Sequence, residues 1–101
     1  MSQRTIYFSV NPGESGGHWI AVNDQDVSLN NHKGTTTVDG VRQKHVLTWW
    51  FTGEEGTKIS IVGSLDAEGA QIVVKVESEV PKDEYDGGGR RRFDLSIKGK
   101  K

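Results

Sequence analysis

Two adjacent tryptophans, Trp49 and Trp50, are the side chains of this sequence best suited to recognising another molecule. They lie in the segment HVLTWWFTGEEGTKISIV, residues 45–62, which is rich in the β-branched and aromatic residues that favour strands. Because adjacent side chains of a strand point to opposite faces, one indole belongs to the core and the other to the surface. A surface indole is a flat apolar platform that suits the face of a sugar ring or an aromatic side chain of a partner.

The turn GEEG that follows the tryptophans decides which of them is buried. A four-residue loop would mix polar and apolar side chains on both faces of a hairpin. A three-residue loop with Gly56 in the left-handed conformation pairs Trp49 with Ile61 and collects the apolar side chains on one face. Burial favours this second register, so we predict that Trp49 lies in the core. Trp50 then lies on the outer face, among threonine and serine hydroxyls and Lys58.

We therefore predict a ligand-binding surface that contains Trp50, Tyr7, Arg42 and Lys58. Tyr7 alternates with the apolar residues of segment 6–10 and should point outward, as should Arg42. The expected partner is a saccharide or another protein. The alternative is that a loop or a second layer of the fold covers Trp50, in which case its role is structural.

The segment YDGGGRRRFD, residues 85–94, groups three arginines with Tyr85 and Phe93, a combination able to hold phosphates and stack on bases. The acidic segment 77–86 and the formal net charge of −1 argue against nucleic acid as a partner. We expect the acidic and basic segments to neutralise each other across strands. The three glycines between them predict a flexible hairpin tip or loop.

Metal and catalytic sites have little support among the remaining polar residues. The acidic turns VNDQDV and PKDEYDG lack the spacing of a calcium loop, and calcium needs about six to eight oxygen ligands. The chain has no cysteine, and its three histidines are too widely spaced to chelate a metal. No serine lies in a nucleophile elbow, and the paired acids Glu54 and Glu55 lie in a solvated turn. We predict a protein that is not an enzyme and uses no metal or cofactor, and rank calcium-dependent binding and catalysis below simple binding.

Alternation of apolar and polar residues recurs along the chain and predicts strands at residues 6–10, 72–77 and 93–97. A further short strand is expected at residues 18–22, where the inward face is ambiguous. With the strands around the tryptophans, about seven short strands joined by tight turns predict an all-β antiparallel sandwich, immunoglobulin-like or jelly-roll-like. Residues 1–101 are expected to form a single domain.

The dipeptide Asp39-Gly40 is the strongest hairpin signal in the sequence. It predicts a two-residue turn with positive φ that places Val38 opposite Val41. The following run, residues 41–52, is long for one strand, so we expect it to bend from one sheet into the other.

The chain shows no apolar stretch long enough for a secretory signal or a membrane-spanning helix, which predicts a cytoplasmic protein without a membrane partner. The predicted function is that of a small non-catalytic binding module, with carbohydrate bound through an exposed aromatic residue on a sheet face. The alternative is a structural or protein–protein interaction domain, such as an oligomer subunit, that uses the same face. The sequence leaves the oligomeric state open.

Overall fold

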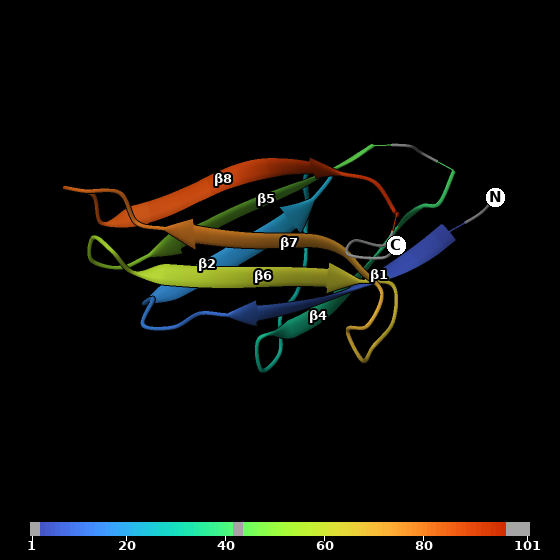
Figure 1. Cartoon of the computed structure of the whole chain (residues 1–101), viewed down its shortest axis with the longest axis horizontal. Coiled ribbons are helices and arrows are strands. Elements are labelled where there is room, and N and C mark those ends of the chain that lie inside the picture. Colours follow the sequence, from blue (N-terminus) through green and yellow to red (C-terminus); the bar gives the residue numbers. More distant parts are fainter. Residues whose placement is uncertain (1–2, 42–43, 97–101) are drawn as a thin grey trace.

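The computed structural model describes residues 3–41 and 44–96, which form two packed antiparallel sheets (Figure 1). The first sheet has the order β4-β1-β6-β7 and contains β1 (Gln3–Asn11), β4 (Lys33–Asp39), β6 (Lys58–Ser64) and β7 (Ile72–Glu79). The second has the order β3-β2-β5-β8 and contains β2 (Gly17–Val22), β3 (Gln25–Asp26), β5 (His45–Thr52) and β8 (Asp86–Phe93). The predicted all-β antiparallel sandwich is confirmed.

The path of the chain crosses repeatedly between the two sheets. Among the described strands, only β2–β3 and β6–β7 are consecutive strands that pair with each other. β4 returns to lie beside β1, β5 beside β2, and β8 beside β5, which is the Greek-key relation. Most connections between the described strands therefore cross from one sheet to the other.

The hairpin predicted at Asp39-Gly40 is wrong. β4 pairs with β1, where Val38 lies opposite Arg4, and the next strand, β5, belongs to the other sheet. Neither residue of the dipeptide has a positive φ. The Asp39 carboxylate instead accepts a hydrogen bond of 2.9 Å from the backbone N–H of Val41, and a side-chain bond of this kind turns the chain without pairing the flanking segments.

The predicted pairing of Trp49 with Ile61 is also wrong, although both side chains are buried as expected. β5 pairs with β2 and β8, whereas β6 pairs with β1 and β7, so the two residues belong to different sheets. The run 41–52 does not bend between sheets, because β5 begins only at His45 and stays in one sheet. The left-handed Gly56 is confirmed, with φ of +86°.

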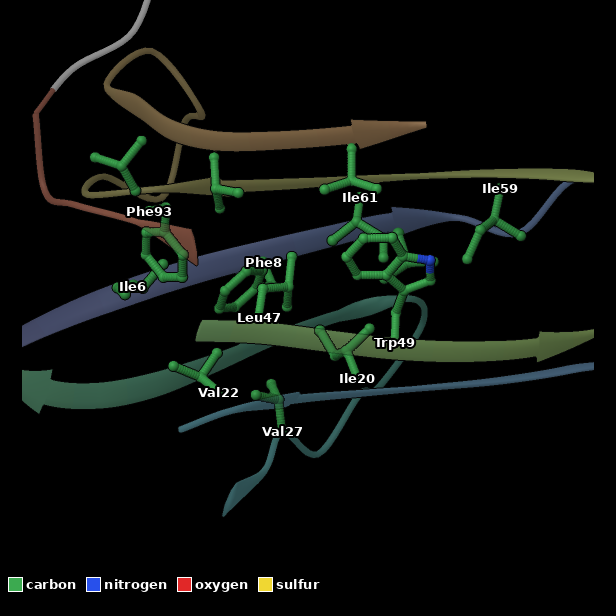
Figure 2. Close-up of a cluster of buried hydrophobic side chains, with 14 of the residues drawn as sticks. Ile6, Phe8, Ile20, Val22, Val27, Leu47, Trp49, Ile59, Ile61 and Phe93 are labelled. Carbon is green, nitrogen blue, oxygen red and sulfur yellow. The ribbon is translucent and has the colours of Figure 1, made fainter. Parts of the chain in front are cut away.

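The core lies between the sheets and is built from the inward side chains of both (Figure 2). In Figure 2, Trp49 rises from β5 toward Ile59 and Ile61 of the opposite sheet. Trp49 is 7% exposed, and Leu47 and Phe51 on the same face of β5 are fully buried. Burial of each such side chain contributes about 1.5–3 kcal/mol, so β5 is a major source of stability.

The last predicted strand is displaced toward the N-terminus. β8 ends at Phe93, which is buried, and Leu95 follows it in a bend packed against the core. Residue 97 lies outside the described residues. The apolar residues Phe93 and Leu95, which predicted a strand over 93–97, therefore contact the core at and just after the end of β8.

Candidate functional site

A pair of tryptophans occupies the outer side of the sheet β3-β2-β5-β8. Trp19 of β2 and Trp50 of β5 lie directly opposite each other in the register of the two strands. Their side chains are 38% and 43% exposed, respectively. Trp50 is thus on the surface, as predicted, but its aromatic neighbour was missed, because segment 18–22 has apolar residues at both parities.

We call this side of the sheet the tryptophan face and define it by the outward residues of the four strands. The register places them on one side: Trp19, Asp26, Val46, Thr48, Trp50, Thr52, Asp86, Gly88, Arg90 and Arg92. Ala21 lies among them and is only 2% exposed, so larger neighbours cover it. The face therefore combines apolar rings with hydroxyl, carboxylate and guanidinium groups.

Both indoles of the tryptophan face are anchored by carboxylates. The Nε1–H of Trp19 donates a hydrogen bond of 2.8 Å to Oδ1 of Asp26. The Nε1–H of Trp50 donates one of 3.0 Å to Oδ2 of Asp86. Because an ionised acceptor strengthens such a bond, each carboxylate fixes the orientation of its ring.

The two anchors lie at opposite margins of the sheet, on β3 and β8. Trp19 therefore extends toward β3 and Trp50 toward β8, and the described residues show no ring contact between the two. With strands about 4.8 Å apart, the four-stranded sheet is about 14 Å wide between its outer strands. The indoles form a strip across this width rather than a stacked pair.

The three glycines of β8 make room for the aromatic residues of β5. Gly87, Gly88 and Gly89 lie opposite Phe51, Trp50 and Trp49. A Cβ on Gly89 would lie 2.8 Å from Cζ2 of Trp49, and one on Gly87 would lie 2.9 Å from the ring of Phe51. The predicted flexible tip is thus wrong, because the glycines are part of a strand where closely packed rings exclude side chains.

Gly88 has a different role, because it faces outward beside Trp50. A Cβ at this position would lie 2.6 Å from the backbone oxygen of Trp49, so the strand admits no larger residue without a shift. No side chain therefore rises from β8 directly opposite Trp50. Trp50, which extends toward β8 to reach Asp86, therefore meets no side chain at the directly opposite position of that strand.

The arginines of β8 point to both sides of the strand. Arg91 shares the inward parity with Gly89, and its Nη1 donates a bond of 3.4 Å to the backbone oxygen of Lys75 in β7. Arg90 and Arg92 lie opposite Thr48 and Val46, on the tryptophan face. The two rings of segment 85–94 do not form a stacking array, because the Tyr85 side chain is exposed before β8 and that of Phe93 is buried at its end.

Two of the other residues predicted for the binding surface, Tyr7 and Lys58, do not join Trp50. Tyr7 of β1 and Lys58 of β6 lie on the outer side of the opposite sheet. Tyr7, 36% exposed, lines an open groove of about 820 Å³ there, and Lys58 lines a second groove of about 430 Å³. Arg42 lies outside the described residues. Lys58 was grouped with Trp50 on the assumption that β6 pairs with β5, whereas β6 pairs with β1 and β7. Tyr7 points outward as predicted, but from the other sheet.

Histidines and acids contribute no metal centre in the part of the chain that the structure describes, since no three of these side chains are placed to hold an ion. The rings of His18 and His32 are 5.5 Å apart. Burial and the neighbouring His32 lower the pKa of His18 below its ordinary value. The acids of the two turns considered for calcium are partly used otherwise, because Asp26 and Asp86 hold the tryptophans.

Comparison with known proteins gives no relative: no family model, no curated protein and no solved structure matches the chain. Within residues 3–41 and 44–96, no helix has the length and apolar character needed to cross a membrane.

Proposed function

We propose that this protein is a non-catalytic binding module whose tryptophan face binds a saccharide. The observation that carries the proposal is the pair of exposed indoles, each held by a carboxylate at a margin of the sheet. The apolar faces of sugar rings pack against indoles, while hydroxyl groups need hydrogen-bonding partners around them. Thr48 and Thr52 supply such partners on the same face.

The fixed orientation of the rings supports binding to a rigid ligand. Ordering a side chain on association costs about 0.5–1.5 kcal/mol when the side chain is free beforehand. Trp19 and Trp50 are already anchored, so this cost is reduced. A preformed strip across the sheet suits an oligosaccharide that lies across the strands.

The non-catalytic part of the proposal is supported by what the acids on this face do. A general acid or base needs a perturbed pKa and a place to meet the reacting atom. Asp26 and Asp86, the carboxylates nearest the rings, accept indole N–H bonds on an open surface. Their positions suit anchoring rather than proton transfer.

A glycan-array screen with four proteins tests the proposal: the wild type, Trp19→Ala, Trp50→Ala and Tyr7→Ala. We expect the tryptophan variants to bind at least about tenfold more weakly, equivalent to about 1.4 kcal/mol, because each removes half of the strip. Tyr7→Ala is the matched control, since it removes a similarly exposed ring from the opposite sheet. Circular dichroism must show that all four are folded.

Either of two other results would contradict this proposal and favour a different site or a different function. Binding lost in Tyr7→Ala but kept in the tryptophan variants would move the site to the groove of the opposite sheet. A blank array with concentration-dependent association in sedimentation, abolished by Trp50→Asp, would favour the protein-interaction alternative. The mixture of rings, Asp86 and Arg90 on one face suits such a self-complementary contact.

A further inference from the structure

We infer that the tryptophan face selects acidic saccharides and that Arg90 and Arg92 bind their carboxylate or sulfate groups. This inference rests on the proposed function and names the class of its ligand. It depends on three features: the position of the two arginines, their lack of partners among the described residues, and the hydrogen bonds that the acids of this face already make.

The register places Arg90 beside the aromatic strip. Arg90 lies opposite Thr48, and Gly88 lies opposite Trp50, so Arg90 is a diagonal neighbour of Trp50 on the same face. Diagonal neighbours in adjacent strands are about 7–8 Å apart, which a long side chain spans. Arg92 lies two residues further along the same edge. An anionic group on a sugar stacked at Trp50 would therefore meet one or both guanidinium groups.

The guanidinium groups of Arg90 and Arg92 make no hydrogen bond or ion pair with the described residues. The intervening Arg91 differs, because it points away and contacts the backbone oxygen of Lys75. A guanidinium presents several N–H donors in a planar fork that matches the two oxygens of a carboxylate or sulfate. The two free arginines are thus available for an anion.

The acids of the same face are occupied or distant. Asp86 accepts the indole N–H of Trp50 and lies four residues from Arg90 along β8, which is about 13 Å. Asp26 accepts the indole N–H of Trp19 at the opposite margin of the sheet, about 14 Å away. Asp94, beyond the end of β8, accepts a bond of 2.9 Å from the backbone N–H of Ser96.

A saccharide fits this arrangement better than a nucleic acid. The formal net charge of the chain is −1, so no extended positive field is present to hold a phosphate backbone. The positive charge is instead local, at one margin of the aromatic strip. A ligand with one or two anionic groups on an otherwise neutral, hydroxyl-rich frame matches this distribution.

Isothermal titration calorimetry of the full chain tests the inference with four probes: an oligogalacturonide, its carboxyl-reduced neutral counterpart, a sulfated oligosaccharide and a short oligothymidylate. The proteins are the wild type, the double variant Arg90→Gln/Arg92→Gln, and the control Lys33→Gln/Lys75→Gln, which removes the same charge from the opposite sheet. Added salt should weaken binding to the acidic probes more than binding to the neutral one.

We expect the wild type and the lysine control to bind an acidic probe at least about tenfold more tightly than the neutral one. The arginine variant should lose this preference and keep its affinity for the neutral probe. The uronate and sulfate arms identify which anion is preferred. The arginine variant removes exposed groups without internal bonds, so its fold should be retained, which thermal unfolding checks.

The inference is overturned if acidic and neutral probes bind equally, or if the arginine variant keeps the preference. In that case the proposed function survives as long as the neutral probe binds and Trp50→Ala abolishes its binding. If no saccharide binds at all, both the inference and the proposed function fail. Tighter binding of the oligothymidylate than of any saccharide would also overturn the inference.

Discussion

The two outer faces of the sandwich differ in how their aromatic residues are surrounded. On the first sheet, Tyr7 lies between Thr35 and Ser64 on the adjacent strands. On the second, Trp50 lies between Trp19 and Gly88. The Tyr7 ring has side chains on both adjacent strands and lines a groove, whereas the Trp50 ring has a glycine on one side. The surface available to a ligand therefore depends on the residue on the neighbouring strand as well as on the aromatic residue itself.

The two faces also differ in how their polar groups are used. On the tryptophan face, Asp26 and Asp86 anchor rings. On the first sheet, Asp66 organises the loop between β6 and β7 by accepting bonds from the backbone N–H groups of Gln71 and Ala70. Carboxylates therefore hold apolar side chains in place on one side and backbone on the other. We therefore expect substitution of Asp86 to affect the orientation of Trp50 and ligand binding, and substitution of Asp66 to affect the stability of the fold.

We expect the largest loss of stability from Gly89→Val, because Gly89 packs against Trp49 in the core beneath the tryptophan face. The new side chain would overlap Trp49 in the core, because a Cβ alone would lie 2.8 Å from the ring. Overpacking of this kind costs about 1–3 kcal/mol, and we expect the free energy of unfolding to fall by at least that amount. Denaturation with urea measures the change.

Arg90→Val is the matched control for this substitution, because it places the same side chain on the adjacent, outward position of β8. Its unfolding free energy should stay close to that of the wild type, since surface substitutions usually change stability by less than about 0.5 kcal/mol. Equal stability of Gly89→Val and Arg90→Val would contradict the steric role of the glycine.

An intermediate effect is expected from Asp86→Ala, which removes the anchor of Trp50. A net hydrogen bond contributes about 1 kcal/mol, so stability should fall by no more than this, while saccharide binding weakens as the ring loses its fixed orientation. In NMR spectra, the indole N–H of Trp50 should exchange with water faster than in the wild type.

Asp86→Asn should restore slow exchange and most of the binding, because its amide oxygen still accepts the bond. This rescue separates a positioning role from a purely electrostatic one. Glu77→Ala, on the exposed surface of β7, should leave the signal of Trp50 unchanged. An unaltered indole signal in Asp86→Ala would show that the anchor is dispensable.

The smallest effect concerns acid stability and belongs to the opposite side of the molecule. The backbone bond from Gln71 is the main cause that lowers the pKa of Asp66 below its ordinary value, and the bond from Ala70 adds to it. Because the native pKa lies below that of the unfolded chain, the ionised carboxylate stabilises the fold at neutral pH. This contribution should diminish below about pH 4 and vanish as the pH falls through the native pKa.

Asp66→Asn should therefore be less stable than the wild type at pH 7, and the difference should shrink at pH 3. Urea midpoints at the two pH values measure it. A difference that is independent of pH would assign the role of Asp66 to its shape and hydrogen bonds rather than to its charge.

Alternation along the chain was sufficient to predict the class of fold. The buried side of β5 was predicted correctly, with Trp49 inward and Trp50 outward, although the hairpin register used to choose it does not form. It could not assign strands to sheets, because Trp49 and Ile61 bury their apolar surface equally well when they pack side by side in one sheet or face to face between two. Sheet assignment depends on the competing partners of each strand, which lie far away in sequence.

The candidate site was only partly predictable for the same reason. Trp50 was found from its parity, but Trp19 was missed, because Ala21 on its side is nearly as buried as Ile20 and the pattern of β2 has no clear inward face. The conformational freedom of glycine alone predicts a flexible tip for segment 85–94. The use of its glycines as space for rings depends on β5, which lies about 40 residues earlier in the chain.

Three consecutive aromatic residues of β5 lie opposite three consecutive glycines of β8, and this pairing limits how the sequence can change in evolution. Gly87 and Gly89 face the rings of Phe51 and Trp49, so the sizes of the residues within each of these two pairs are coupled rather than independent. In descendants of this sequence, a larger residue at position 89 should be accepted only together with a smaller one at position 49. Related sequences that keep this packing of β5 against β8 should therefore show covariation between residues 49–51 and 87–89.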